Sequence, residues 1–284
     1  MSTESQTQSG NSPALLRVVG LSKCYWAPRR GPWEKRKKIQ AVADANFEIA
    51  SGETLGLIGN SGAGKSTIAR CVARLEMPDR GEIRLEETDI ARLCGRDMRR
   101  LQSPIQMIFQ DPITAMNPRM SAAEIIEEPL LIRNQGTPVQ RRAQAFELMR
   151  EVDLSPDWLD RSIGQFSGGQ RQRIAIARAL TLKTKVLVLD EALANLDLST
   201  QAQIIDLLRR LQVLHSISYL LISHDLALVA SMAENIAILS GGRIVEQGPT
   251  RELISNPMHT ATKELVRATQ ELRKGFPLSR RAFA

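Results

Sequence analysis

A nine-residue segment combines glycines with a lysine and hydroxyl side chains in a pattern that suits phosphate binding. It consists of Gly59, Asn60, Ser61, Gly62, Ala63, Gly64, Lys65, Ser66 and Thr67. The glycines permit backbone conformations that turn successive N–H groups towards an anion. Lys65 adds a positive charge, and Ser66 offers a hydroxyl to a magnesium ion that bridges the terminal phosphates. The segment predicts binding of a nucleoside triphosphate; the alternative is a Gly-rich turn without a ligand.

Two carboxylates follow a second apolar segment. Val186 to Leu189 predicts a buried strand, and Asp190 and Glu191 come directly after it. Ligands bind at the carboxyl ends of strands in open α/β sheets. We expect Asp190 to hold the magnesium ion through water and Glu191 to polarise the water that attacks the γ-phosphorus. Acidic residues also cap strands without any catalytic role, but the upstream phosphate loop favours the catalytic interpretation.

A third segment, the serine–glycine loop Ser167, Gly168, Gly169 and Gln170, precedes a helical pattern rich in Arg and Ala. Glycines and a serine at the start of a helix form a second N-terminus that can receive an anion. The chain therefore carries two loops suited to phosphate. A flexible turn is the alternative for this short segment.

The surrounding pattern alternates strands and helices, which predicts a mainly parallel sheet covered by helices. A helical stretch from Ser121 to Asp153, with breaks at Pro129 and at 136–138, interrupts this alternation. The expected strands are Leu15 to Val19, Ala41 to Ile49, Thr54 to Ile58, Ile105 to Phe109, Val186 to Leu189, Tyr219 to Ile222 and two within 236–246. The other expected helices are Lys65 to Arg74, Gln170 to Leu182, Thr200 to Leu214, Leu226 to Ala233 and 250–272.

Composition narrows the classes of protein. The 284 residues suffice for one large domain. Cys24, Cys71 and Cys94 lack paired metal-type spacing, so we expect reduced thiols. The net charge of +7 includes a basic run from Arg29 to Lys38, but aromatic residues are only 4% of the chain, so nucleic acid binding is disfavoured. No apolar run reaches the roughly 18 residues of a membrane span, and Met1 to Asn11 lacks the features of a secretion signal, so we expect a cytoplasmic protein.

Six motifs occur in the order found in the ATP-binding subunit of an ABC transporter, which this chain resembles over about residues 14 to 250. They are the phosphate loop, Phe109-Gln110-Asp111, Ser167 to Gln170, Leu189-Asp190-Glu191, Asn195-Leu196-Asp197 and Ser223-His224-Asp225. The resemblance implies an α/β fold of the P-loop NTPase class with a mainly parallel sheet, an antiparallel β subdomain and an inserted helical subdomain at about 112–183. It also implies a disordered start at 1–13 and a helical tail at 251–284.

The same resemblance implies roles for individual residues, with ATP and Mg²⁺ as the bound groups. Tyr25 should stack on adenine, with Trp26 as its substitute. Gln110 should contact magnesium and report the nucleotide state to a membrane partner, and His224 should contact the γ-phosphate. The serine–glycine loop should clamp the γ-phosphate held by the opposite subunit, with Asp197 at the dimer seam. Phe166 and the run Ala192-Leu193-Ala194 depart from the family pattern, but every catalytic position that can be matched is kept.

Within the family, the chain resembles the second ATPase subunit of dipeptide, oligopeptide and nickel importers. The residues that carry this likeness are the insert before Lys38, Met116 to Arg119 and Ser199 to Ile204, whereas 256–260 matches only partly. The expected function is to energise import of peptides, or else nickel, from the cytoplasmic face of the membrane. The implied partners are a homologous ATPase subunit, two membrane-spanning permease subunits and an extracytoplasmic substrate-binding protein.

Two other classes remain open. One is a non-transport ABC ATPase, such as the scaffold of a phosphonate-processing complex or a DNA-repair or translation factor. The other is a phosphoryl-transfer kinase that uses the phosphate loop alone. A kinase would leave the serine–glycine loop and His224 without a function.

Overall fold

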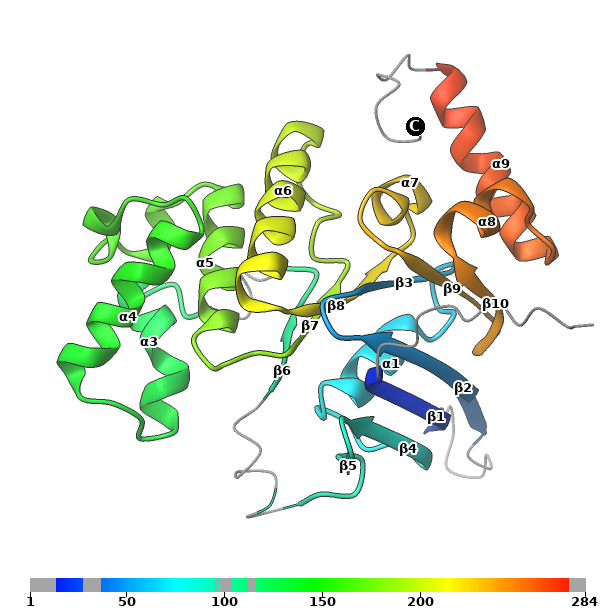
Figure 1. Cartoon of the computed structure of the whole chain (residues 1–284), viewed down its shortest axis with the longest axis horizontal. Coiled ribbons are helices and arrows are strands. Elements are labelled where there is room, and N and C mark those ends of the chain that lie inside the picture. Colours follow the sequence, from blue (N-terminus) through cyan, green and yellow to red (C-terminus); the bar gives the residue numbers. More distant parts are fainter. Residues whose placement is uncertain (1–13, 28–36, 95–96, 98–103, 112–115, 276–284) are drawn as a thin grey trace, which may run out of the picture.

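The computed structural model describes residues 14–27, 37–94, 97, 104–111 and 116–275, with the backbone alone for 272–275. Two sheets and a group of helices form the molecule (Figure 1). The expected disordered start at 1–13 lies outside the described residues. So do most of the basic run and residues 276–284 of the expected helical tail.

The larger sheet has six strands in the order β10-β9-β3-β8-β7-β6. Neighbours from β9 to β6 pair in parallel, and β10 pairs with β9 in the antiparallel sense. Its strands are β3 Thr54–Ile58, β6 Ile105–Ile108, β7 Val186–Asp190, β8 Ser218–Ser223, β9 Asn235–Ser240 and β10 Arg243–Pro249. β3, β7 and β8 are buried along their whole lengths because both faces of the sheet are covered. The expectation of a mainly parallel sheet is confirmed.

The smaller sheet is antiparallel and has the order β2-β1-β4-β5. β1 Ala14–Trp26 and β2 Lys38–Ala50 pair along their full lengths and are much longer than the two expected strands. β4 Arg80–Leu85 and β5 Thr88–Asp89 had no counterpart among the expected strands. Only Ile83 and Leu85 of β4 are buried, so its sequence carries little of the apolar alternation that predicts strands.

Helix α1, Lys65–Val72, lies between the two sheets. Ile68, Ala69, Cys71 and Val72 share one hydrophobic core with side chains from both sheets. The opposite face of the parallel sheet is covered by α5 Gly168–Leu180, α6 Leu198–His215 and α7 Leu226–Ala230. Side chains alternate between the faces, since Val186 and Val188 face the α1 core and Leu187 and Leu189 face the other.

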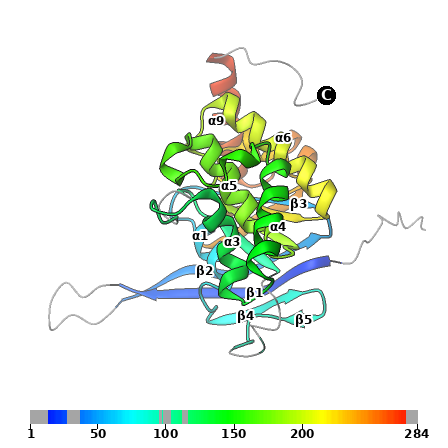
Figure 2. The ribbon, with the colours of Figure 1, turned by 90° about the vertical axis from the view of Figure 1, so that its left-hand side faces the viewer.

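Two further helices pack on α5 at the far side of the molecule from the tail, as Figures 1 and 2 show. They are α3 Ala122–Ile132 and α4 Pro138–Glu151. The expected break at Pro129 is wrong, because α3 continues through this residue. A proline inside a helix costs about 3 kcal/mol, and α3 keeps its form while burying Ile125, Ile126 and Leu130. The break at 136–138 is present, with Thr137 capping α4 and Pro138 in its first turn.

The last described elements are α8 Thr250–Ser255 and α9 Thr260–Gly275, next to the β9 and β10 end of the sheet (Figure 1). Glu246 of β10 accepts hydrogen bonds from the backbone N–H groups of Met258 and His259, each at 2.9 Å, and from the hydroxyl of Thr262. These bonds tie the turn between the two helices to the sheet. None of the helices in the described part of the chain is both long and apolar enough to cross a membrane.

Candidate functional site

The phosphate loop connects β3 to α1, as the sequence predicts, and two of its glycines have left-handed backbones. Gly62 has a φ of +77° and Gly64 a φ of +106°. A Cβ on Gly62 would meet nothing within 4 Å, whereas a Cβ on Gly64 would lie 2.3 Å from the carbonyl oxygen of Ala41. Residue 64 must therefore be glycine for two reasons, its left-handed backbone and its close approach to β2.

The turn between β9 and β10 supports the phosphate loop from behind. The N–H of Gly242 donates to the carbonyl of Ala63 at 3.1 Å, and the carbonyl of Gly242 accepts from the N–H of Ala43 at 2.7 Å. The turn thereby bridges the loop and β2. Sequence reasoning missed this support, because only the tertiary fold brings residue 242 beside residue 63.

Lys65 is 5% exposed and extends along the phosphate loop. Its Nζ donates to the carbonyls of Gly59 at 2.7 Å and Asn60 at 3.1 Å, and lies 3.8 Å from Oε1 of Glu191. Burial lowers the pKa of Lys65, while the charges of Glu191 and Asp190 oppose this shift. The ammonium thus lies at the loop, next to the two carboxylates that follow β7.

Ser66 and Asp190 provide two oxygens that fit a magnesium ion. The Ser66 hydroxyl donates to Oδ1 of Asp190 at 3.1 Å. Burial raises the pKa of the Asp190 carboxyl, which is only 8% exposed, and neighbouring Glu191 adds to the rise while the Ser66 bond opposes it. A cluster of three or more His, Cys, Asp or Glu side chains able to hold a metal by themselves is absent from the described residues. This donor set suits Mg²⁺, which binds proteins through few oxygens and completes its shell with phosphates and water.

Glu191 is held in an unusual conformation beside His224. Its φ is +49°, a region that costs a non-glycine residue of the order of 1 kcal/mol, and its N–H donates to the carbonyl of Ile222 at 3.0 Å. Oε1 of Glu191 lies 3.5 Å from Nδ1 of His224, whose side chain is 61% exposed. The fold thus brings together Lys65, Ser66, Asp190, Glu191 and His224.

Tyr25 lies against α1, whereas the side chain of Trp26 is 60% exposed. The Tyr25 hydroxyl donates to the carboxylate of Glu76 and lies 3.5 Å from the hydroxyl oxygen of Thr67 in the phosphate loop. Of the two aromatic residues considered for adenine stacking, Tyr25 is therefore the one in contact with the phosphate-loop helix. Sequence reasoning missed Glu76, since the contact joins strand β1 to the segment after α1.

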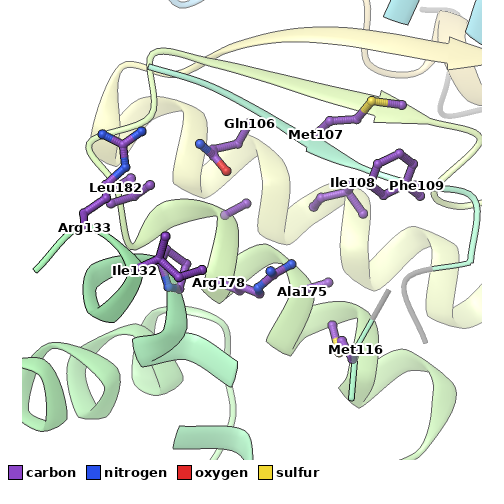
Figure 3. Close-up of a pocket in the computed structure, with 12 residues that line it drawn as sticks. Gln106, Met107, Ile108, Phe109, Met116, Ile132, Arg133, Ala175, Arg178 and Leu182 are labelled. Atoms are coloured by element: carbon purple, nitrogen blue, oxygen red, sulfur yellow. The ribbon is translucent and has the colours of Figure 1, made fainter. Parts of the chain in front are cut away.

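Gln110 is exposed just beyond the end of β6, and the residues before it line a groove of about 260 Å³ (Figure 3). Phe109 and Met107 lie on one side of this groove, and Ile132 of α3 and Arg178 of α5 lie on the other. The groove therefore lies between strand β6 of the parallel sheet and helices α3 and α5. Residues 112–115 of the Pro-containing segment that follows Gln110 lie outside the described residues.

The serine–glycine loop starts α5 with a reciprocal cap. The Ser167 hydroxyl accepts from the N–H of Gln170 at 3.3 Å, and Oε1 of Gln170 accepts from the N–H of Ser167 at 2.9 Å. Ser167 and Gly168 are exposed. The first turn of α5 thus presents an open helix N-terminus, as expected for an anion site.

Asp197 caps α6 and forms a second cluster with the serine–glycine loop through Thr200. It accepts hydrogen bonds from the backbone N–H of Thr200 at 3.0 Å and from its hydroxyl at 2.6 Å, and these bonds lower the pKa of Asp197. The Thr200 methyl lies where a Cβ on Gly169 would meet it at 2.7 Å. Sequence reasoning did not select Thr200, whose type and position in a helix give no signal of this contact.

Comparison with known proteins gives one consistent result. The family model described as "ABC transporter" matches residues 42–194. The chain is 43% identical to a "Probable peptide ABC transporter ATP-binding protein" of Sinorhizobium fredii, over 90% of this chain and 73% of the relative. It is 38% identical to the dipeptide transport ATP-binding protein of Haemophilus influenzae, over 92% of this chain and 80% of the relative. A dimeric ATP-binding cassette in a post-hydrolysis state with ADP and Pi superposes with a TM-score of 0.71 at 26% identity, covering 83% of this chain and 98% of that one.

Proposed function

Because the chain belongs to the family of ABC transporter ATP-binding proteins, we propose that it hydrolyses ATP to drive an importer of peptides. The observation that carries this proposal is the likeness, over most of the chain, to ATP-binding proteins named for peptide and dipeptide transport. The cluster around Lys65 and Glu191 supplies groups suited to the reaction.

ATP binds, in this proposal, with its phosphates on the loop of residues 59 to 67 at the start of α1. Backbone N–H groups and the positive end of α1 face the anion, and Lys65 balances part of its charge. Ser66, Asp190 and Gln110 would hold Mg²⁺, which would supply positive charge to neutralise the terminal phosphates. Tyr25 supports the base from the end of β1.

Glu191 orients and polarises the water that attacks the γ-phosphorus. Two neighbours orient its carboxylate. Oε1 of Glu191 lies 3.8 Å from Nζ of Lys65 and 3.5 Å from Nδ1 of His224. The backbone bond from Glu191 to Ile222 fixes the position of the residue relative to β8. A general base works only when it is held within reach of the proton that it accepts.

Each pocket is completed by a second cassette, either a second copy or a close homologue. The serine–glycine loop and Asp197 form a cluster of their own, and the described hydrogen bonds of that cluster do not include the phosphate loop. An exposed helix N-terminus at Gly168 is suited to the γ-phosphate held by the partner. ATP then joins the two subunits, and hydrolysis removes that connection.

The groove beside Gln110 is where we place the contact with the permease at the cytoplasmic face of the membrane. It lies between the sheet that carries the carboxylates and a pair of helices, α3 and α5, of which α5 begins at the serine–glycine loop. A membrane subunit seated there would follow relative movement of the two parts. Two permease subunits and an extracytoplasmic binding protein complete the proposed importer.

The proposal is tested by purifying the chain with its membrane partner and reconstituting both in vesicles. We expect ATP hydrolysis that increases when a peptide-loaded binding protein is added, together with ATP-dependent uptake of labelled peptide. Uptake of Ni²⁺ without peptide uptake would contradict the peptide assignment. Copurification with soluble enzymes, and never with a permease, would instead favour the scaffold of a phosphonate-processing complex.

A further inference from the structure

Thr200, in the first turn of α6, contacts both segments that we assign to the partner's nucleotide. We propose that Thr200 is a positioning residue that sets the serine–glycine loop relative to Asp197. The inference rests on the proposed function, in which both segments complete the pocket of the opposite subunit. It concerns a residue that touches no nucleotide and acts through its two neighbours.

The polar side of Thr200 holds Asp197. Its backbone N–H donates to Oδ1 at 3.0 Å and its hydroxyl donates to Oδ2 at 2.6 Å. A helix cap requires only the backbone bond. The hydroxyl occupies the second carboxylate oxygen and thereby fixes the rotation of the carboxylate about its own axis. Asp197 is exposed, and each of its two carboxylate oxygens accepts a hydrogen bond from Thr200.

The apolar side of Thr200 seats the serine–glycine loop. A Cβ on Gly169 would lie 2.7 Å from the Thr200 methyl carbon, closer than real Cβ contacts occur. A Cβ on Gly168 would meet nothing within 4 Å. The two adjacent glycines therefore serve different purposes. Within this chain, Gly169 must lack a side chain because it rests on Thr200, while the fold itself places no such demand on Gly168.

Thr200 also lies next to the connection that leads to Glu191. Nε2 of Gln201 donates to the carbonyl of Leu193 at 3.0 Å, and the N–H of Ala194 donates to the carbonyl of Glu191 at 3.1 Å. The start of α6 is thus tied to the loop that carries Glu191 for the chain's own pocket. Through Thr200, the same turn contacts the loop that serves the partner's pocket.

The hydroxyl is tested with Thr200→Val and Thr200→Ser in the complete transporter complex. Loss of a hydrogen bond to a charged acceptor predicts a fall in kcat of about tenfold for Thr200→Val. Thr200→Ser keeps the hydroxyl and should stay within about twofold of the wild type. Binding of fluorescent ATP by the isolated subunit should not change in either variant, since its own phosphate loop is intact. Thr137→Val removes the capping hydroxyl of α4 and controls for a merely structural loss. Wild-type kcat in Thr200→Val, or an equal loss in Thr137→Val, would overturn the proposal.

The methyl contact is tested with Gly169→Ala alone and combined with Thr200→Ser, which removes the opposing methyl. We expect the single variant to lower both kcat and the Tm of the isolated subunit, and the double variant to recover most of each loss. A double variant as impaired as Gly169→Ala in both measurements would overturn the proposal. Absence of ATP hydrolysis by the wild-type complex would contradict the proposed function. The Tm measurement needs no ATPase activity, so it tests the contact between Gly169 and Thr200 even in that case.

Discussion

Nζ of Lys65 and Oε1 of Glu191 lie 3.8 Å apart and form an ion pair. The ammonium proposed to balance the phosphate charge is therefore paired with the carboxylate proposed to polarise the attacking water. Lys65 is 5% exposed, and burial lowers its pKa while Glu191 opposes that shift. The two residues come from α1 and the end of β7, which are 126 positions apart in the chain. The carboxylate thus helps to keep the ammonium charged at the loop where the γ-phosphate would bind.

Replacement of Glu191 by Gln should separate hydrolysis from binding. The amide keeps the shape of the side chain but cannot accept a proton from water, so phosphate release should fall about 100-fold or more. ATP binding should remain, because the phosphate loop and Ser66 are unchanged. Phosphate release and binding of labelled ATP check the two expectations. Glu147→Gln, at an exposed side chain of α4, is the matched control, and wild-type turnover in Glu191→Gln would refute the role given to the Glu191 carboxylate.

Replacement of Asp190 by Asn should stabilise the nucleotide-free protein at neutral pH while removing Mg²⁺-dependent hydrolysis. Burial raises the pKa of the Asp190 carboxyl, so the folded chain binds its proton more readily than the unfolded chain does. Stability linked to this group is therefore greatest below the unfolded pKa of about 3.9 and is lost as pH rises through the folded pKa.

The variant lacks this penalty, so its Tm at pH 7.5 should exceed that of the wild type. The difference should vanish below about pH 3.9, where the Asp190 carboxyl is protonated in both the folded and the unfolded chain. Asp206→Asn, at a side chain that is 73% exposed on α6, is the control and should show no such gain. A lower Tm for Asp190→Asn than for the wild type at pH 7.5 would contradict the argument.

Replacement of Ser167 by Arg should abolish ATP-dependent dimers. The Arg side chain would stand at the open start of α5, where we place the partner's γ-phosphate, and would remove the reciprocal cap with Gln170. Light scattering with ATP, in a Glu191→Gln background that slows turnover, checks the expectation. Thr137→Arg has the same change at an equivalent cap of α4 and should leave dimers intact. Dimers that persist in Ser167→Arg would contradict the shared pocket, whereas the absence of ATP-dependent dimers in the Glu191→Gln parent itself would favour a monomeric kinase.

The parts of the site that follow one another along the chain could be predicted from the sequence, and those joined by packing could not. The phosphate loop and the carboxylates after β7 have local signatures, because their chemistry demands specific residue types at fixed spacing. The contact of Thr200 with Gly169 joins two helix starts that are 31 positions apart in the chain. Threonine and glycine are both common at helix starts, so neither residue indicates this contact in the sequence. Strand β4 was likewise not predicted, because only two of its side chains are buried and its sequence therefore carries a weak apolar pattern.

Cys71 should resist alkylation in the folded protein. It is buried within α1, and burial raises the pKa of its thiol to about 11, so about one thiol in a thousand is ionised at pH 8. Cys94 is exposed and should react first. Iodoacetamide labelling followed by peptide mass spectrometry checks the order, with urea-unfolded protein as the control in which both react. Labelling of Cys71 as fast as Cys94 in the native protein would contradict the packing of α1.

The two left-handed glycines of the phosphate loop should differ in their tolerance of alanine. At Gly62 the added methyl meets nothing within 4 Å, so only the backbone conformation is penalised, at about 1 kcal/mol. At Gly64 the same penalty is joined by a Cβ placed 2.3 Å from the backbone oxygen of Ala41, which cannot move without disturbing β2. We expect Gly64→Ala to lose about 3 kcal/mol of unfolding free energy. Urea unfolding without nucleotide compares the two variants directly. Equal losses would show that β2 yields to the methyl and that the close approach does not explain why residue 64 is glycine.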